Sequence, residues 1–161
     1  MSLKSGPVQQ FSIRAGAVAM ATADTLVGFT GPANSTRTDP AVQFTPTPTR
    51  IPGDNCAAII NAETVPQAQS GQFGVWVKIT QTGQLCWPYR VAVRWRNLDS
   101  GYSDGQVAPR RRNGVINAPD GVITGMGMAP GTGNVEAWID TTYEDHREME
   151  HIAGRVTLAL G

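Results

Sequence analysis

One run of alternating side chains constrains the fold of this chain more than any other feature. In residues 84–97, QLCWPYRVAVRWRN, every second position is apolar or aromatic, and the second half of the run places arginines between them. Successive side chains of an extended strand point to opposite faces. The run therefore predicts one long, central β-strand with a cationic face, and with Trp87, Tyr89 and Trp95 on the face that lines a core.

A second alternating run, residues 72–81, ends just before the pair Thr82-Gly83. Two alternating runs separated by a short glycine-containing turn are typical of a β-hairpin. We therefore expect 84–97 to pair antiparallel with 72–81. Pro88 has no N–H to donate, so it is expected at a bulge or on an edge-facing position.

Turn-forming residues are abundant, with 18 Gly and 11 Pro, and charged residues make up only 16% of the chain. The proline-rich segment 30–55 is expected to be extended and to pair poorly in a central sheet. The composition and about eight to ten short strands predict an all-β chain, an antiparallel β-sandwich of jelly-roll-like type, with a partly open β-barrel as the alternative. We expect residues 1–161 to form a single β domain. The predicted strands, besides the hairpin, are 11–20, 25–29, 41–45, 56–62, 106–108, a small hairpin of 114–117 and 121–124, 135–145 and 154–160.

The two cysteines, Cys56 and Cys86, both lie in strand-like runs. The N-terminal residues contain no apolar secretory segment, so two buried free thiols are favoured over a disulfide. No apolar run reaches the roughly 18 residues that a membrane-spanning helix needs. These patterns favour a virion or cytoplasmic location without membrane contact.

The formal net charge is zero, which argues against a general binder of nucleic acid or anionic membranes. Arg90, Arg94 and Arg96 on the cationic face would suit phosphate, sulfate or an acidic polymer. The alternative is a ladder of charges with Glu136, Asp140 and Glu144, which share their two-residue spacing on 135–145. Because the chain is neutral overall, we favour the ladder.

A loop with three adjacent arginines, Arg110, Arg111 and Arg112, is a second candidate binding segment. Stable sequence-independent binding of nucleic acid usually neutralises about six or more phosphates, so three charges are few. An exposed loop is favoured over nucleic-acid recognition, and a contact with another subunit stays open.

Residues 144–151 hold both histidines and four carboxylates, and His146, Glu148 and His151 are weak candidates for metal ligands. The motif HExxH is absent, and histidines five residues apart suit neither a helix nor a strand well. We therefore expect a solvated charged loop before the last strand.

The catalytic sequence motifs GxSxG, Walker A and CxxC are absent. We therefore expect a non-enzymatic structural or assembly protein without a cofactor, such as a decoration, capsid or tail component of a phage or viral particle, which acts through subunit contacts and forms a homo-oligomer. The first alternative is a carbohydrate-binding module that stacks sugars on Trp76, Trp138 and Tyr102. The second is a metal-dependent enzyme built on residues 144–151.

Overall fold

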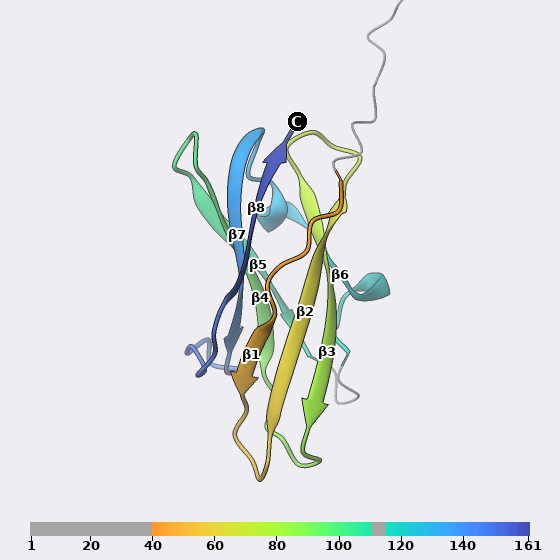
Figure 1. The fold of residues 1–161 in the computed structure, drawn as a ribbon, viewed down its shortest axis with the longest axis vertical. Coiled ribbons are helices and arrows are strands. Elements are labelled where there is room, and N and C mark those ends of the chain that lie inside the picture. Colours follow the sequence, from red (N-terminus) through yellow and green to blue (C-terminus); the bar gives the residue numbers. More distant parts are fainter. Residues whose placement is uncertain (1–39, 111–114) are drawn as a thin grey trace, which may run out of the picture. The chain divides into compact units, whose positions relative to one another are not determined.

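A computed structural model describes residues 40–110 and 115–161, and it shows two four-stranded antiparallel sheets packed face to face (Figure 1). The strand orders are β1-β2-β3-β6 in the first sheet and β5-β4-β7-β8 in the second. The predicted β-sandwich is confirmed, whereas the predicted strands 11–20 and 25–29 lie outside the described residues. The strands are β1 (Thr47–Arg50), β2 (Ala57–Pro66), β3 (Phe73–Thr82), β4 (Arg90–Asn97), β5 (Ser103–Pro109), β6 (Val122–Ile123), β7 (Gly133–Thr142) and β8 (Gly154–Leu160).

The core lies between the two sheets and uses the alternation that the sequence predicted. Tyr89, Val91, Val93 and Trp95 are all buried, as expected for the apolar face of residues 84–97. Ile60 of β2 and other residues of the first sheet belong to the same apolar cluster. Burial of such large apolar side chains is the main favourable contribution to folding.

The predicted hairpin of 72–81 with 84–97 is wrong. Strand β3 pairs with β2 and briefly with β6, whereas β4 lies in the other sheet between β5 and β7. The chain after Thr82 crosses from one sheet to the other through residues 83–89, which form no strand, and Pro88 lies in this crossover. Strand β4 is central, as expected, but it begins only at Arg90. The alternation shows which face of a strand is buried, but it does not show which of the two sheets the strand belongs to.

The described part of the proline-rich segment, residues 40–55, contains the edge strand β1, which agrees with its expected poor pairing in a central sheet. Strand β1 pairs with β2 on one side. On its other side the backbone N–H of Arg50 donates to the carbonyl oxygen of Glu150 at 2.9 Å, and Ile152 donates to Pro48 at 3.0 Å. Pro48 therefore takes part in this edge contact only as an acceptor, because it has no N–H to donate. The segment joins the two sheets along one side of the sandwich.

The remaining predicted elements agree with the structure to different degrees. Strands β7 and β8 agree closely with 135–145 and 154–160, and β5 is longer than the expected 106–108. The small hairpin of 114–117 with 121–124 is wrong, because β6 pairs with β3 while Ile116 bridges to Arg110. None of the described residues forms a helix long and apolar enough to cross a membrane.

Candidate functional site

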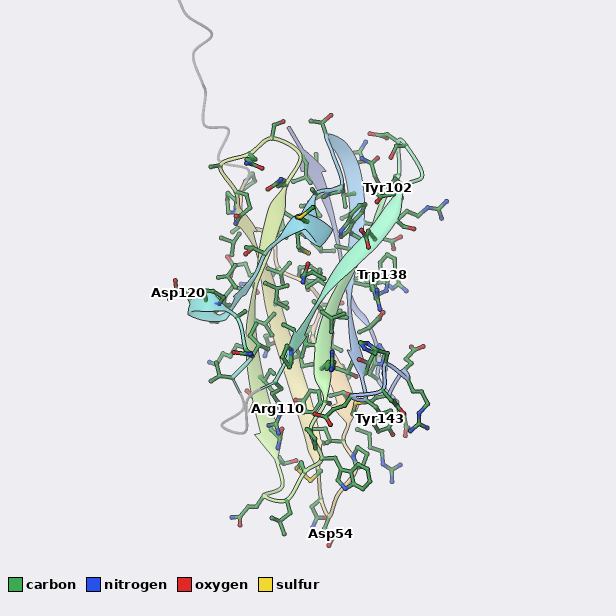
Figure 2. The ribbon with its side chains drawn as sticks, turned by 180° about the vertical axis from the view of Figure 1, so that it is seen from behind. Asp54, Tyr102, Arg110, Asp120, Trp138 and Tyr143 are labelled. Atoms are coloured by element: carbon green, nitrogen blue, oxygen red, sulfur yellow. A yellow bond between two sulfur atoms is a disulfide. The ribbon has the colours of Figure 1, made fainter. Side chains whose placement is uncertain are left out.

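The predicted charge ladder is partly formed on the outer face of the second sheet, which is the nearer sheet in Figure 2, where Trp138 is labelled. Strands β4 and β7 pair antiparallel, with Arg96 opposite Glu136. The Nε atom of Arg94 lies 3.8 Å from Oδ2 of Asp140. Glu136 instead accepts a hydrogen bond of 3.1 Å from Arg155 of β8.

The residues at one end of the predicted ladder, Arg90 and Glu144, are not opposite each other. Arg90 lies opposite Thr142, and Glu144 follows the end of β7. Glu144 therefore occupies no position opposite Arg90 on the paired strands. Among the three arginines of the cationic face, only Arg94 lies within ion-pair distance of an acidic side chain of the described residues, Asp140.

Asp140 and His151 form a nearly buried polar pair at the edge of this face. Nε2 of His151 lies 3.3 Å from Oδ1 of Asp140, and its Nδ1 lies 2.8 Å from the carbonyl oxygen of Met149. The His151 side chain is 2% exposed, against 21% for Asp140. The indole N–H of Trp138 donates to the other Asp140 oxygen at 3.2 Å. Asp140 thus links the returning chain at His151 to the outer face of β7.

The candidate metal ligands are not assembled into a site. Glu148 Oε1 is 3.9 Å from Nε2 of His151, while His146 lies in an exposed turn. Across residues 40–110 and 115–161, no group of three His, Cys, Asp or Glu side chains is arranged to hold a metal ion. In the same turn Arg147 donates a hydrogen bond of 2.7 Å to Asp145, which lowers the pKa of Asp145 and raises that of Arg147.

Arg110 connects the two sheets. Its Nη1 donates to the side-chain oxygen of Gln81 on β3 at 2.6 Å, and its guanidinium lies 4.9 Å from the centre of the Tyr89 ring. Burial raises the pKa of Tyr89 to about 12, and the charge of Arg110 opposes this rise. Arg111 and Arg112 lie outside the described residues, so the binding role expected of them stays a prediction.

The two candidate tryptophans lie on different faces. Trp76 of β3 is 40% exposed on the outer face of the first sheet. Trp138 is half-buried on the outer face of the second sheet, where the Arg155 guanidinium lies 5.5 Å from its ring centre. The exposed Tyr102 follows β4, and its ring centre is 5.4 Å from that of Trp95. Because Trp76 and Trp138 are on opposite sides of the sandwich, they cannot form one sugar-binding platform.

The two cysteines are not free thiols. Cys56 and Cys86 form a disulfide with a Cα–Cα distance of 5.6 Å, and the expectation of two free thiols is overturned. The bond joins the turn between β1 and β2 to the crossover between the sheets. Because this crossover replaces the expected hairpin, no local sequence pattern indicated that the two residues would meet.

The disulfide lies beneath a pair of exposed apolar side chains, Leu85 and Trp87, which we call the apolar tip. Leu85 is 88% exposed and Trp87 is 62% exposed, although both were expected on the core face. These residues form no strand, and Cys86 between them bonds to Cys56 while both of its neighbours lie in solvent. The sequence pattern did not predict this exposure.

The backbone of the tip is tightly held. The N–H of Trp87 donates to the carbonyl oxygen of Pro52 at 3.0 Å. Gly53 has φ of +128°, and a Cβ there would lie 2.8 Å from the carbonyl oxygen of Leu85. The turn therefore packs directly on the crossover, and residues 83–89 carry no charged side chain.

Two apolar concavities accompany the tip. A side groove of about 610 Å³ lies along β1 and β2, where Ile59 and Ile152 are exposed beside the ion pair of Arg50 and Glu150. An end groove of about 410 Å³ lies between the end of β2 and the end of β8. Its lining carries no charged side chain and its apolar residues include Val42, Val65, Pro66, Phe73, Leu158 and Leu160.

Comparison of the chain with protein-family models, with curated proteins and with solved structures found no significant match.

Proposed function

We propose that this chain is a non-enzymatic structural protein that acts through contacts with neighbouring subunits, in the manner of a decoration, capsid or tail component of a phage or viral particle. The observation that carries the proposal is the apolar tip. Leu85 and Trp87 lie largely in solvent on a backbone that a disulfide and the Pro52 hydrogen bond hold in place.

An exposed tryptophan on an ordered loop is well suited to an interface. Trp is among the residues that contribute most to protein–protein affinity, particularly where it enters a desolvated pocket. A loop that is already ordered loses little conformational entropy on binding. Leu85 and Trp87 meet both conditions, because their backbone is tied at Cys86 and at Trp87 itself.

The joined edges of the sandwich also support a mechanical role. Hydrogen bonds from residues 45–50 to residues 150–155 connect the first sheet to the second. The disulfide and the contact of Arg110 with Gln81 add two further links between separate parts of the chain. Covered strand edges also limit unwanted edge-to-edge association, so that contacts are directed to other surfaces.

The proposal is tested by measuring the mass of the full chain in solution over a wide concentration range. We expect size-exclusion chromatography with light scattering to show a weight-average mass that rises from the monomer value as concentration increases. Electron microscopy of the concentrated sample should then show ordered assemblies. A mass that stays at the monomer value up to millimolar concentration would contradict the proposal.

A further inference from the structure

We infer that His151 and Asp140 form a proton-dependent clasp, which holds residues 148–152 against β7 while a proton lies between the two side chains and releases them when that proton is lost. We call this pair the proton clasp. It does not depend on assembly, because both side chains belong to the same copy of the chain.

Both ring nitrogens of His151 face oxygen atoms. Nδ1 lies 2.8 Å from the carbonyl oxygen of Met149, which can only accept a hydrogen bond, so Nδ1 carries a proton. Nε2 lies 3.3 Å from Oδ1 of Asp140. A neutral imidazole has one donor nitrogen and one acceptor nitrogen, so its Nε2 would direct a lone pair at a carboxylate oxygen. The contact is therefore a hydrogen bond only when a second proton lies between Nε2 and Oδ1.

This second proton belongs to His151. A carboxyl group is ordinarily ionised at neutral pH. The other oxygen of Asp140 receives the indole N–H of Trp138 at 3.2 Å and lies 3.8 Å from Nε of Arg94, and both a donor and a cation match a negatively charged carboxylate. His151 is therefore an imidazolium in this arrangement, and its contact with Asp140 is an ion pair as well as a hydrogen bond.

A second acid also faces the ring. Oε1 of Glu148, on the same loop, lies 3.9 Å from Nε2 of His151. From β1 the facing residue is the uncharged Thr49, and Arg50 beside it pairs with Glu150 in a largely exposed contact. The two acids place negative charge beside the ring, which attracts an imidazolium and gives a neutral imidazole no such attraction.

Burial makes the proton necessary for the contact. The His151 side chain is 2% exposed, so water cannot readily replace a lost hydrogen bond. Without the proton, Nε2 and Oδ1 of Asp140 are two acceptors that face each other in a nearly buried place, which is unfavourable. Histidine is the side chain that ordinarily changes charge between about pH 5 and pH 8. The clasp is therefore closed at the lower pH and opens as the pH rises.

The segment that the clasp holds covers the outer side of β1. The N–H of Arg50 donates to the carbonyl oxygen of Glu150 at 2.9 Å, and the N–H of Ile152 donates to that of Pro48 at 3.0 Å. Release of residues 148–152 leaves these two groups of β1 without their partners. A strand edge with free N–H and C=O groups is able to pair with another chain. The proton clasp thus makes the exposure of this edge dependent on pH.

The first test detects the ring protons directly. The chain has two histidines, His146 and His151, so nitrogen-15 magnetic resonance gives two sets of ring signals. At about pH 5 both nitrogens of His151 should carry protons, and at about pH 9 the one remaining proton should be on Nδ1. The exposed His146 should show no fixed Nδ1–H form. A neutral His151 with its proton on Nε2 would overturn the proton clasp.

The second test measures hydrogen exchange at the covered edge. Between about pH 5 and pH 9, the protection factors of the Arg50 and Ile152 amides should fall about tenfold or more, because each depends on the held segment. The amide of Phe44, which donates to Ala62 within the first sheet, should keep its protection factor. This range ends below the pH at which Tyr89 loses its proton. Unchanged protection of Arg50 and Ile152 would overturn the inference.

Two variants assign the pH response to this pair. His151→Gln removes the titrating ring and should abolish the fall in protection, whereas the same substitution at the exposed histidine, His146→Gln, should leave it unchanged. Asp140→Asn should also abolish it, because an amide can accept from an imidazolium or donate to a neutral ring, and this variant provides the same test if His151→Gln does not fold. A fall in protection that persists in both variants would show that another group is responsible and would overturn the proton clasp.

Discussion

The indole N–H of Trp95 donates a hydrogen bond of 2.6 Å to the carbonyl oxygen of Gly127. Trp95 is a central core residue of β4, and Gly127 lies in a short 3-10 turn, η2 (Met126–Met128), which precedes β7. A Cβ at Gly127 would collide with the carbonyl oxygen of Gly105 on β5. The hydrogen bond therefore positions the connection between the two sheets at a point where its backbone lies directly against the backbone of β5.

Replacing Trp95 by Phe should lower the free energy of unfolding by about 2 kcal/mol, because it removes a buried hydrogen bond and leaves unfilled volume. Urea denaturation followed by far-ultraviolet circular dichroism measures this. Trp87→Phe is the matched control and should change stability by no more than about 0.5 kcal/mol, since Trp87 is largely exposed. Equal effects of the two substitutions would contradict the assignment of Trp95 to the core.

Reducing the Cys56–Cys86 disulfide should lower the free energy of unfolding by about 3–4 kcal/mol. The two cysteines are 30 residues apart in sequence, and opening a loop of this length restores conformational entropy to the unfolded chain. Denaturation with and without a phosphine reductant measures the difference. The double variant Cys56→Ser with Cys86→Ser should match the reduced protein and show no response to reductant. Two titratable thiols in the untreated, denatured protein would refute the disulfide.

Asp140→Asn should destabilise the protein by about 1–3 kcal/mol, because it removes the carboxylate that faces the nearly buried His151 and receives the Trp138 hydrogen bond. Glu136→Gln is the comparison, since Glu136 pairs with Arg155 in a mostly solvent-exposed ion pair. Such surface pairs contribute roughly 0.2–1 kcal/mol. Thermal unfolding at neutral pH should therefore show a clearly larger loss for Asp140→Asn, and the opposite order would be inconsistent with the polar pair.

Stability should fall as the pH rises above about 10, partly through Tyr89. Its folded-state pKa of about 12 exceeds the ordinary value of 10.0, so the fold favours the neutral phenol. This contribution is complete below pH 10 and is lost as the pH rises from 10 towards 12, with a total of about 2–3 kcal/mol. Absorbance of tyrosinate, recorded during a pH titration, should show one tyrosine that ionises late.

Tyr89→Phe should remove that part of the alkaline loss and cost little stability at neutral pH. The Tyr89 hydroxyl is buried, and none of the described residues forms a hydrogen bond with it. Its removal therefore breaks no hydrogen bond with them. A variant that loses several kcal/mol at pH 7 would indicate a bonded hydroxyl and would contradict this placement.

Strand identity was largely predictable, because it depends on local pattern. The predicted strand 154–160 coincides with β8, and the predicted strand 135–145 overlaps most of β7, which runs from Gly133 to Thr142. The buried positions Val91, Val93 and Trp95 also followed directly from alternation. In each case the information lies within one segment, since a strand's two faces are set by its own sequence.

The candidate site was much less predictable. The alternation that buried Trp95 also predicted burial of Leu85 and Trp87, yet the strand begins only after Pro88 and Cys86 turns inward to its disulfide partner. The side chains of Arg90, Arg94 and Arg96 were placed on the correct face, but only Arg94 among them lies within ion-pair distance of an acidic residue of the described chain. Which acid an arginine reaches depends on register and side-chain geometry across strands.

By itself the sequence favoured an antiparallel β-sandwich over a partly open barrel, and it predicted which face of β4 is buried. Only the tertiary structure decided that β4 leaves its neighbour β3 for the other sheet, that Cys56 meets Cys86, and that Leu85 and Trp87 point into solvent. The physical reason is that a period of two specifies the faces of a strand and carries no information about its partner. Pairing is selected by the burial of the whole core, to which distant segments contribute together.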